Sequence, residues 1–212
     1  MILWRFWERK WNKIDNNGIN KVFKTLGASS HTDNERQKED FYATDPIAID
    51  LLIKETEIKF DKNIWECSAG QGHLSERLKS FGFDVKSTDL VNRGYCDSGV
   101  DFLTYNETWN GDIITNPPYK FAQQFVEKAI DIIPYGNKVA MFLRLNFIES
   151  KGRKKLFKTY PPKYVYACSG RVLCAKNADF QGMKDGGGSA VAYAWFVWEK
   201  GYEGKTTLDW VN

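Results

Sequence analysis

Histidine and cysteine are scarce in this 212-residue chain, which holds two histidines and four cysteines. No two cysteines are spaced C-x-x-C, so the common structural zinc sites are not expected. No apolar run approaches the roughly 20 residues that span a bilayer, and no stretch has the charged start, apolar core and small-residue cleavage site of a signal peptide. These absences predict a soluble, cytoplasmic and reduced protein that binds no metal and crosses no membrane.

Charge of one sign is not in excess either, because the formal net charge is only +3. This balance neither demands nor excludes a polyanionic partner, since a local basic patch can bind phosphates. The composition is 42% hydrophobic and 15% aromatic, which indicates a folded globule. The length suits one α/β domain of about 100–200 residues, which we place at residues 41–212, after an N-terminal segment at 1–40.

The N-terminal segment has a character of its own. Its apolar residues Leu3, Trp7, Trp11 and Ile14 are spaced as one face of a helix, with basic residues around the rest. This pattern predicts a short helix that either packs on the domain or contacts a second copy or a nucleic acid. Residues 27–40 are polar without periodicity, and we expect them to form an arm.

Strand and helix patterns alternate after Asp45 and Pro46, which have the composition of a helix N-cap and first turn. The first expected strand ends at residue 67. The others cover 84–88, 112–115, 138–145, 163–167 and 190–198. Further helices are expected over 74–81 and 121–133. Repeated strand–helix units predict a mostly parallel sheet with helices on both faces, and the last two strands predict an antiparallel hairpin on one edge.

A glycine-rich turn follows the first expected strand. It runs from Glu66 through Ser68 and Ala69 to Gly70 and Gly72, at a strand-to-helix junction where open α/β sheets bind ligands. Glycines allow a close approach of the backbone to a ligand, and small neighbours keep the turn open. Many turns contain two glycines, so the spacing alone is a weak sign of a nucleotide-type site.

Acidic residues downstream strengthen this interpretation. Asp89 ends the next expected strand, about twenty residues after the acid of the turn, where a carboxylate binds ribose hydroxyls. Asp101 would hydrogen-bond the amine of an adenine, and Phe102 would stack on the adenine ring. The alternatives are an exposed carboxylate or helix cap for Asp89, and a loop acid beside a core phenylalanine for the pair.

The tetrapeptide Asn116-Pro117-Pro118-Tyr119 is the most informative motif in the chain. It directly follows the expected strand 112–115 and precedes a helix. Two prolines cannot continue a central strand, because each lacks an N–H and has a fixed φ. The motif therefore predicts a rigid turn whose carbonyls face outward at the carboxyl end of the sheet.

Together these motifs resemble those of class I S-adenosylmethionine-dependent methyltransferases. Ser75 occupies the third glycine position of the dinucleotide fingerprint, which disfavours pyrophosphate binding. In one class of amino-methyltransferases, a segment precedes the sheet and closes over the methionine moiety. A similar segment here is Phe41-Tyr42-Ala43-Thr44-Asp45-Pro46, which resembles it. The motif order is similar to that of the gamma class of DNA adenine-N6 methyltransferases, whose catalytic motif the Asn-Pro-Pro-Tyr turn resembles.

The resemblance implies a fold, a cofactor and a reaction. The fold would be Rossmann-like with a seven-stranded, mostly parallel sheet, and S-adenosylmethionine would be the cofactor. The enzyme would methylate the exocyclic amine of an adenine flipped out of DNA. The Asn116 side-chain oxygen and the Pro117 carbonyl would accept hydrogen bonds from that amine, and Tyr119 would stack on the base. The implied cofactor-binding residues are Phe41, Tyr42, Thr44, Glu66, Ser68, Ala69, Gly70, Gly72, Asp89, Asp101, Phe102 and Asn116.

Two later segments are candidates for nucleic-acid contact, and each is also explained by an ordinary polar surface. The first is a basic cluster on an expected helix, which would contact phosphates. The second is a polar loop with one aromatic residue, which would grip the extruded base. Their candidate residues are Lys151, Arg153, Lys154, Lys155, Arg171, Lys176 and Phe180.

Other substrates and another class of function stay open. The same tetrapeptide occurs in enzymes that methylate a glutamine amide in release factors and in some RNA adenine methyltransferases, because both targets present a planar amino group. A catalytically idle accessory subunit that binds nucleic acid is the alternative of another class. The chain has no room for a separate recognition domain, so DNA specificity would come from a short site, a homodimer or a partner protein.

Overall fold

The computed structural model describes residues 42–175 and 178–212. The expected N-terminal helix and arm at 1–40, together with Phe41 and Lys176, lie outside the described residues. The other predicted site residues lie within them.

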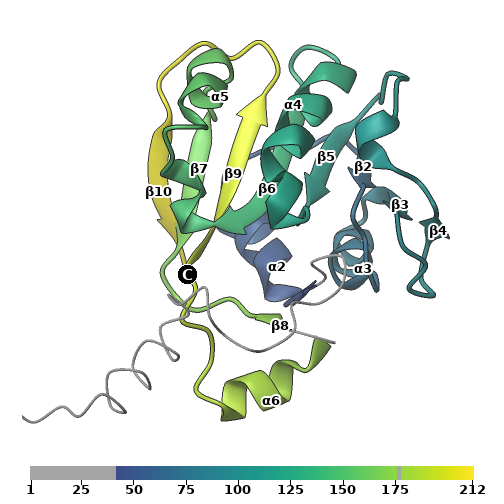
Figure 1. The fold of residues 1–212 in the computed structure, drawn as a ribbon, viewed down its shortest axis with the longest axis vertical. Coiled ribbons are helices and arrows are strands. Elements are labelled where there is room, and N and C mark those ends of the chain that lie inside the picture. The colour runs from purple at the N-terminus through teal and green to yellow at the C-terminus, as the bar shows by residue number, and fades with distance from the viewer. Residues whose placement is uncertain (1–41, 176–177) are drawn as a thin grey trace, which may run out of the picture. The chain divides into compact units, whose positions relative to one another are not determined.

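The centre of the fold is one eight-stranded sheet with the order β10-β7-β9-β6-β5-β2-β3-β4 (Figure 1). Strands β2 to β6 run parallel to one another, whereas β9 is antiparallel to both β6 and β7. The strands of this sheet are β2 (Asn63–Glu66), β3 (Asp84–Asp89), β4 (Asp97–Ser98), β5 (Asp112–Thr115), β6 (Lys138–Arg144), β7 (Tyr164–Cys168), β9 (Tyr193–Glu199) and β10 (Thr207–Val211).

Helices cover both faces of the sheet. Residues of α4 and α5 pack on one face, and residues of α2 and α3 pack on the other. The α-helices are α2 (Ile47–Lys54), α3 (His73–Ser80), α4 (Ala122–Ile132), α5 (Lys154–Thr159) and α6 (Phe180–Asp185). Short 3-10 helices are η2 (Phe102–Thr104), η3 (Tyr119–Phe121) and η4 (Leu145–Ile148).

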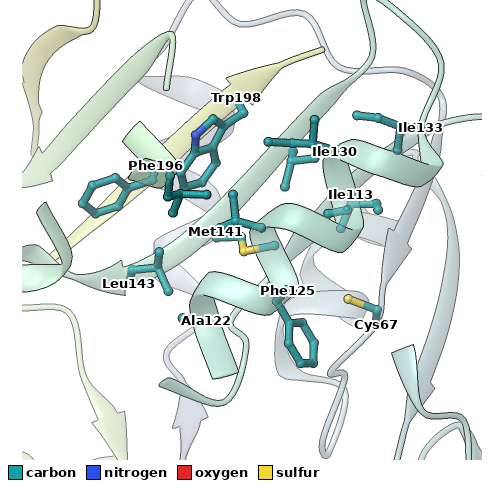
Figure 2. Packing of buried hydrophobic residues seen from close by; sticks show 14 of the residues in the cluster. Cys67, Ile113, Ala122, Phe125, Ile130, Ile133, Met141, Leu143, Phe196 and Trp198 are labelled. Atoms are coloured by element: carbon teal, nitrogen blue, oxygen red, sulfur yellow. The ribbon is translucent and has the colours of Figure 1, made fainter. Parts of the chain in front are cut away.

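Alternating side chains of β6 supply both layers of the core. Met141 and Leu143 point to the α4 side, where Phe125 and Phe196 meet them (Figure 2). Phe142 belongs to the layer beneath α2 and α3. Because successive strand residues face opposite sides, a continuously apolar strand is what a sheet buried on both faces requires.

The sheet confirms the expected α/β class and its mostly parallel character, with a difference at one edge. The two late strands β7 and β9 do pair antiparallel, but β9 lies inside the sheet between β6 and β7. The edge is formed by β10, an eighth strand that pairs parallel with β7. Only Val211 of β10 is buried, so the strand lacks the apolar alternation by which a sequence pattern identifies strands.

A second, two-stranded sheet joins β1 (Ala43–Thr44) to β8 (Cys174–Ala175) in antiparallel register. In Figure 1, β8 and α6 lie beyond the end of the main sheet to which β5 and β6 point. The N–H of Asp45 donates to the carbonyl of Leu173 at 2.9 Å and extends this pairing. The segment before the main sheet is thereby fixed at the sheet's carboxyl edge.

Candidate active site

The turn after β2 is tied to the end of β3 by two hydrogen bonds. The N–H of Ala69 donates to the carbonyl of Thr88 at 3.0 Å, and the N–H of Gly70 donates to Oδ2 of Asp89 at 2.8 Å. Gly70 has φ +57° and Gly72 has φ +85°, a left-handed conformation that favours glycine. The turn and the end of β3 are therefore joined by hydrogen bonds into one unit.

Asp89 is only half-buried, and its carboxylate has acceptor capacity left. Its second oxygen accepts from the N–H of Val91 at 2.8 Å. Each carboxylate oxygen has two lone pairs, so both backbone contacts leave room for hydroxyl donors from a ligand.

Glu66 lies beneath the turn and is 2% exposed. Ser75 at the start of α3 donates a hydrogen bond to its carboxyl group, and Ser75 also lies 2.7 Å from the hydroxyl of Ser87. Burial, with a smaller contribution from the charge of Asp89, raises the pKa of Glu66 to about 8. In this structure Glu66 supports the turn from inside instead of presenting its carboxyl group at the surface.

Tyr95, in the loop after β3, packs against Gly72. A Cβ atom at Gly72 would overlap the Tyr95 ring, so this glycine permits the packing of an aromatic side chain. The Tyr95 hydroxyl donates to Glu76 at 2.6 Å and accepts from Lys79 at 3.0 Å, both on α3. The sequence indicates that Gly72 lets a ligand approach the backbone, and it gives no sign of this contact with Tyr95.

Asp101 and Phe102 have structural partners of their own. The Asp101 carboxylate accepts from the N–H of Leu103 at 3.0 Å and caps η2. Phe102 is 2% exposed, and its ring centroid lies 5.3 Å from that of Trp65 and 5.0 Å from that of Phe125. Phe102 is thus a core residue without an open ring face for adenine, which corrects the stacking interpretation and agrees with the alternative.

Asn116 directly follows β5, and only one end of its side-chain amide has a hydrogen-bond partner among the described residues. Its Nδ2 atom donates to the hydroxyl of Thr44 on β1 at 2.6 Å. Its Oδ1 atom is buried and has no hydrogen-bond partner among the described residues. An unsatisfied buried acceptor costs about 1–3 kcal/mol, so the site carries an acceptor that a bound donor would satisfy.

Tyr119 lies in a cluster of planar and polar groups. The guanidinium of Arg144, at the end of β6, lies 4.8 Å from the ring centroid, and the ring of Tyr193 lies 6.2 Å away. The Tyr119 hydroxyl donates to Sγ of Cys174 at 3.6 Å. A base that stacks on Tyr119 would displace Arg144, which costs little because an exposed cation–π contact is worth about 0.5–1 kcal/mol.

The nucleic-acid candidates on the basic helix lie away from this turn. Figure 1 shows α5, which carries Lys154 and Lys155, at the end of the sheet away from β8. Arg153 donates from Nε to the carbonyl of Phe147 at 2.7 Å, so its guanidinium is engaged within the protein. Lys151 and Arg171 are exposed. Phe180 packs edge-on against His73 at 5.6 Å, which places it near the start of α3.

In the ranges 42–175 and 178–212, no three histidine, cysteine or acidic side chains are grouped to hold a metal ion. No helix in the same ranges is long and apolar enough to cross a membrane.

Solved structures share this architecture, although no family profile and no curated protein sequence matches the chain. A protein from Lactococcus lactis assigned as a hemolysin aligns with TM-score 0.57 and 10% identity, over 78% of this chain and 91% of its own. One from Agrobacterium tumefaciens assigned as an O-methyltransferase gives 0.52 and 12%, over 76% and 84%. One from Listeria monocytogenes assigned as a class I S-adenosylmethionine-dependent methyltransferase gives 0.50 and 12%, over 93% and 74%.

The chain has the class I methyltransferase fold. At these identities the likeness concerns the fold. In the class I methyltransferase fold of this chain, the glycine turn after β2 and the Asn-Pro-Pro-Tyr turn after β5 follow adjacent parallel strands, so both lie at one edge of the sheet.

Sequence reasoning missed the residues that surround the Asn-Pro-Pro-Tyr turn. Cys174 and Arg144 belong to strands β8 and β6, and Tyr193 begins β9. The sequence pattern could have identified Arg144 as a site residue, because it is the charged residue at the carboxyl end of an apolar strand. Cys174 had no such signal, since the apolar run 172–175 around it is too short to show a period.

Proposed function

We propose that this protein transfers a methyl group from S-adenosylmethionine to the exocyclic N6 amine of adenine in DNA. The observation that carries the proposal is the buried Oδ1 atom of Asn116, an acceptor without a partner among the described residues, at the carboxyl edge of a class I methyltransferase fold. The Asn-Pro-Pro-Tyr motif at that position supports the choice of a planar amino group as the acceptor.

The residues fit the cofactor. The turn from Ser68 to Gly72 would receive it, and the half-buried carboxylate of Asp89 would accept its ribose hydroxyls. When bound, S-adenosylmethionine would supply an electrophilic methyl group on a sulfonium sulfur.

The chemistry asks the protein for orientation more than for a base. The lone pair of an aryl amine is delocalised into the ring, which makes the amine a poor nucleophile. Hydrogen bonds from its two N–H groups to Asn116 Oδ1 and to the Pro117 carbonyl would localise the lone pair on nitrogen. A reacting distance of about 3–3.5 Å then supplies much of the rate enhancement. As the nitrogen takes the methyl group, the methyl–sulfur bond would break with its electron pair left on a neutral thioether, and the methylated nitrogen would lose its extra proton to water.

A base is favoured over a glutamine side chain by the surroundings of the turn. Tyr119 and the exposed Arg144 present planar groups at the turn that begins with Asn116. Planar aromatic and guanidinium groups stack on an extruded base, whereas a glutamine amide gains little from them.

The test offers the full-length protein three acceptors together with methyl-labelled cofactor: unmethylated duplex DNA, structured RNA and a release factor. We expect label in DNA, recovered as N6-methyladenine after digestion to nucleosides. Label only in RNA or in a glutamine amide would overturn the DNA assignment. Cofactor binding without transfer to any acceptor would favour the accessory-subunit alternative.

A further inference from the structure

A chain of polar contacts runs beneath the Asn-Pro-Pro-Tyr turn and connects its first and last residues. The Tyr119 hydroxyl lies 3.6 Å from Sγ of Cys174, and that sulfur lies 3.9 Å from Oγ1 of Thr44. Thr44 Oγ1 in turn accepts from Nδ2 of Asn116 at 2.6 Å. The two intermediate residues come from β1 and β8, which are 130 positions apart in the chain.

Backbone pairing fixes the two intermediate residues. Thr44 and Cys174 are directly opposite each other in the antiparallel pair β1–β8. They are 4% and 5% exposed. Water therefore does not replace either contact, and opposite residues in such a pair keep their side chains within reach of each other.

The hydrogen-bond donors of the chain are protonated groups. Burial raises the pKa of Tyr119 well above its ordinary value, and burial also raises the pKa of Cys174. Both groups therefore keep their protons near neutral pH, and in the contacts of the structure the phenol donates to sulfur and the thiol donates to Thr44. The Thr44 oxygen then accepts from two donors, the thiol and the amide nitrogen of Asn116.

These contacts decide which way the Asn116 amide faces. In the structure the amide nitrogen is the neighbour of the Thr44 oxygen, which accepts its hydrogen bond. The amide oxygen is then turned away from Thr44 and is the atom left without a partner. The reverse orientation would present N–H groups to an incoming amine, and two sets of donors repel each other.

We propose that Thr44 and Cys174 are positioning residues for the methyl transfer proposed above, because they turn the oxygen of Asn116 toward the acceptor amine and anchor the hydroxyl of Tyr119. The inference rests on that proposed function. It gives a role to β8, a strand outside every motif of the sequence.

Steady-state kinetics of matched variants test the role. Thr44→Val keeps the shape and removes the hydroxyl, and we expect kcat to fall about tenfold because one oriented hydrogen bond is lost. The KM for DNA should stay within about twofold, since the amide orientation matters in the transition state. Thr44→Ser should restore most of the lost kcat.

Cysteine variants test the second member. Cys174→Ala should lower kcat about threefold, because a thiol is a weak donor, and Cys174→Ser should restore part of the loss. Cys168→Ala, a partly buried cysteine of β7, is the matched control and should leave kcat unchanged. A kcat near the wild-type value in both Thr44→Val and Cys174→Ala, with active wild-type enzyme, would overturn the inference.

A spectroscopic measurement that needs no methyl transfer tests this inference separately from the proposed function. The infrared S–H stretching band of Cys174, identified by its loss in Cys174→Ser, should shift when Thr44→Val removes the thiol's acceptor. An unshifted band would overturn the contact, whatever the substrate. A wild-type protein that methylates no DNA but shows the shift would overturn only the proposed function.

Discussion

The main-chain N–H of Gly70 and the carboxylate of Asp89 form one hydrogen bond across the carboxyl ends of two adjacent parallel strands. The same carboxylate accepts a second backbone N–H from Val91. Asp89 therefore shapes the turn after β2 and the loop after β3 at once. A residue with this double role should affect ligand binding through both geometry and charge.

Asp89→Ala should weaken cofactor binding by about tenfold or more, because each hydrogen bond to a charged group is worth roughly 1.5–3 kcal/mol. Isothermal titration with S-adenosylmethionine measures the change. Asp97→Ala, an exposed acid on β4, serves as the control and should bind normally. Equal affinity in the two variants would remove Asp89 from the cofactor site.

Asn116→Ala should lower kcat by about 100-fold or more, as does the loss of one preorganised polar group in other active sites. Cofactor affinity should stay within about threefold of the wild type, since the proposed contact is with the acceptor amine. The exposed Asn110→Ala is the control. A parallel loss of cofactor binding in Asn116→Ala would contradict the assigned role.

Glu66 predicts a dependence of stability on pH. Its pKa is about 8 in the folded protein and 4.5 in the reference state, so the folded state retains a proton that the unfolded state releases. The free energy of unfolding should therefore fall as pH rises from about 4.5 to about 8. Glu66→Gln should flatten this slope in urea denaturation, whereas the exposed Glu107→Gln should not. A wild-type slope of opposite sign in this window would refute the assignment to Glu66.

Trp195 should make a measurable contribution to stability. It is fully buried in β9, and its Nε1 donates to the carbonyl of Ala48 in α2 at 2.8 Å. Trp195→Phe removes this hydrogen bond and part of a fully buried side chain, and should lower the free energy of unfolding by about 1–3 kcal/mol. Trp210→Phe, at a residue 63% exposed, should change it by less than about 0.5 kcal/mol. Denaturant titration compares the two, and similar values would show that the Ala48 contact adds nothing.

Strong local patterns allowed much of the fold to be predicted. The apolar segment 138–144 and the alternation of strands and helices from β2 to β6 match the structure closely. These elements are buried on both faces or carry an amphipathic stripe, so their hydrophobic period is visible in the sequence. The positions of the glycine turn and of Asn116 at strand ends were predictable for the same reason.

Long-range pairing was not predictable in this way. The placement of β9 inside the sheet, the strand β10 and the pairing of β1 with β8 depend on partners distant in sequence. Phe102 shows a related effect, because an acid–aromatic pair has the same local pattern whether its ring packs in the core or faces a ligand. Only the neighbours Trp65 and Phe125 decide between these uses.

The interior position of β9 has a consequence for synthesis on the ribosome. Until residues 193–199 have left the exit tunnel, β6 and β7 have no strand between them, and the apolar edge of β6 stays open to solvent. Nascent chains with an unpaired edge are prone to aggregate. Arrest of translation before β9 should therefore yield chains held by chaperones, and release after it should yield chains that resist protease.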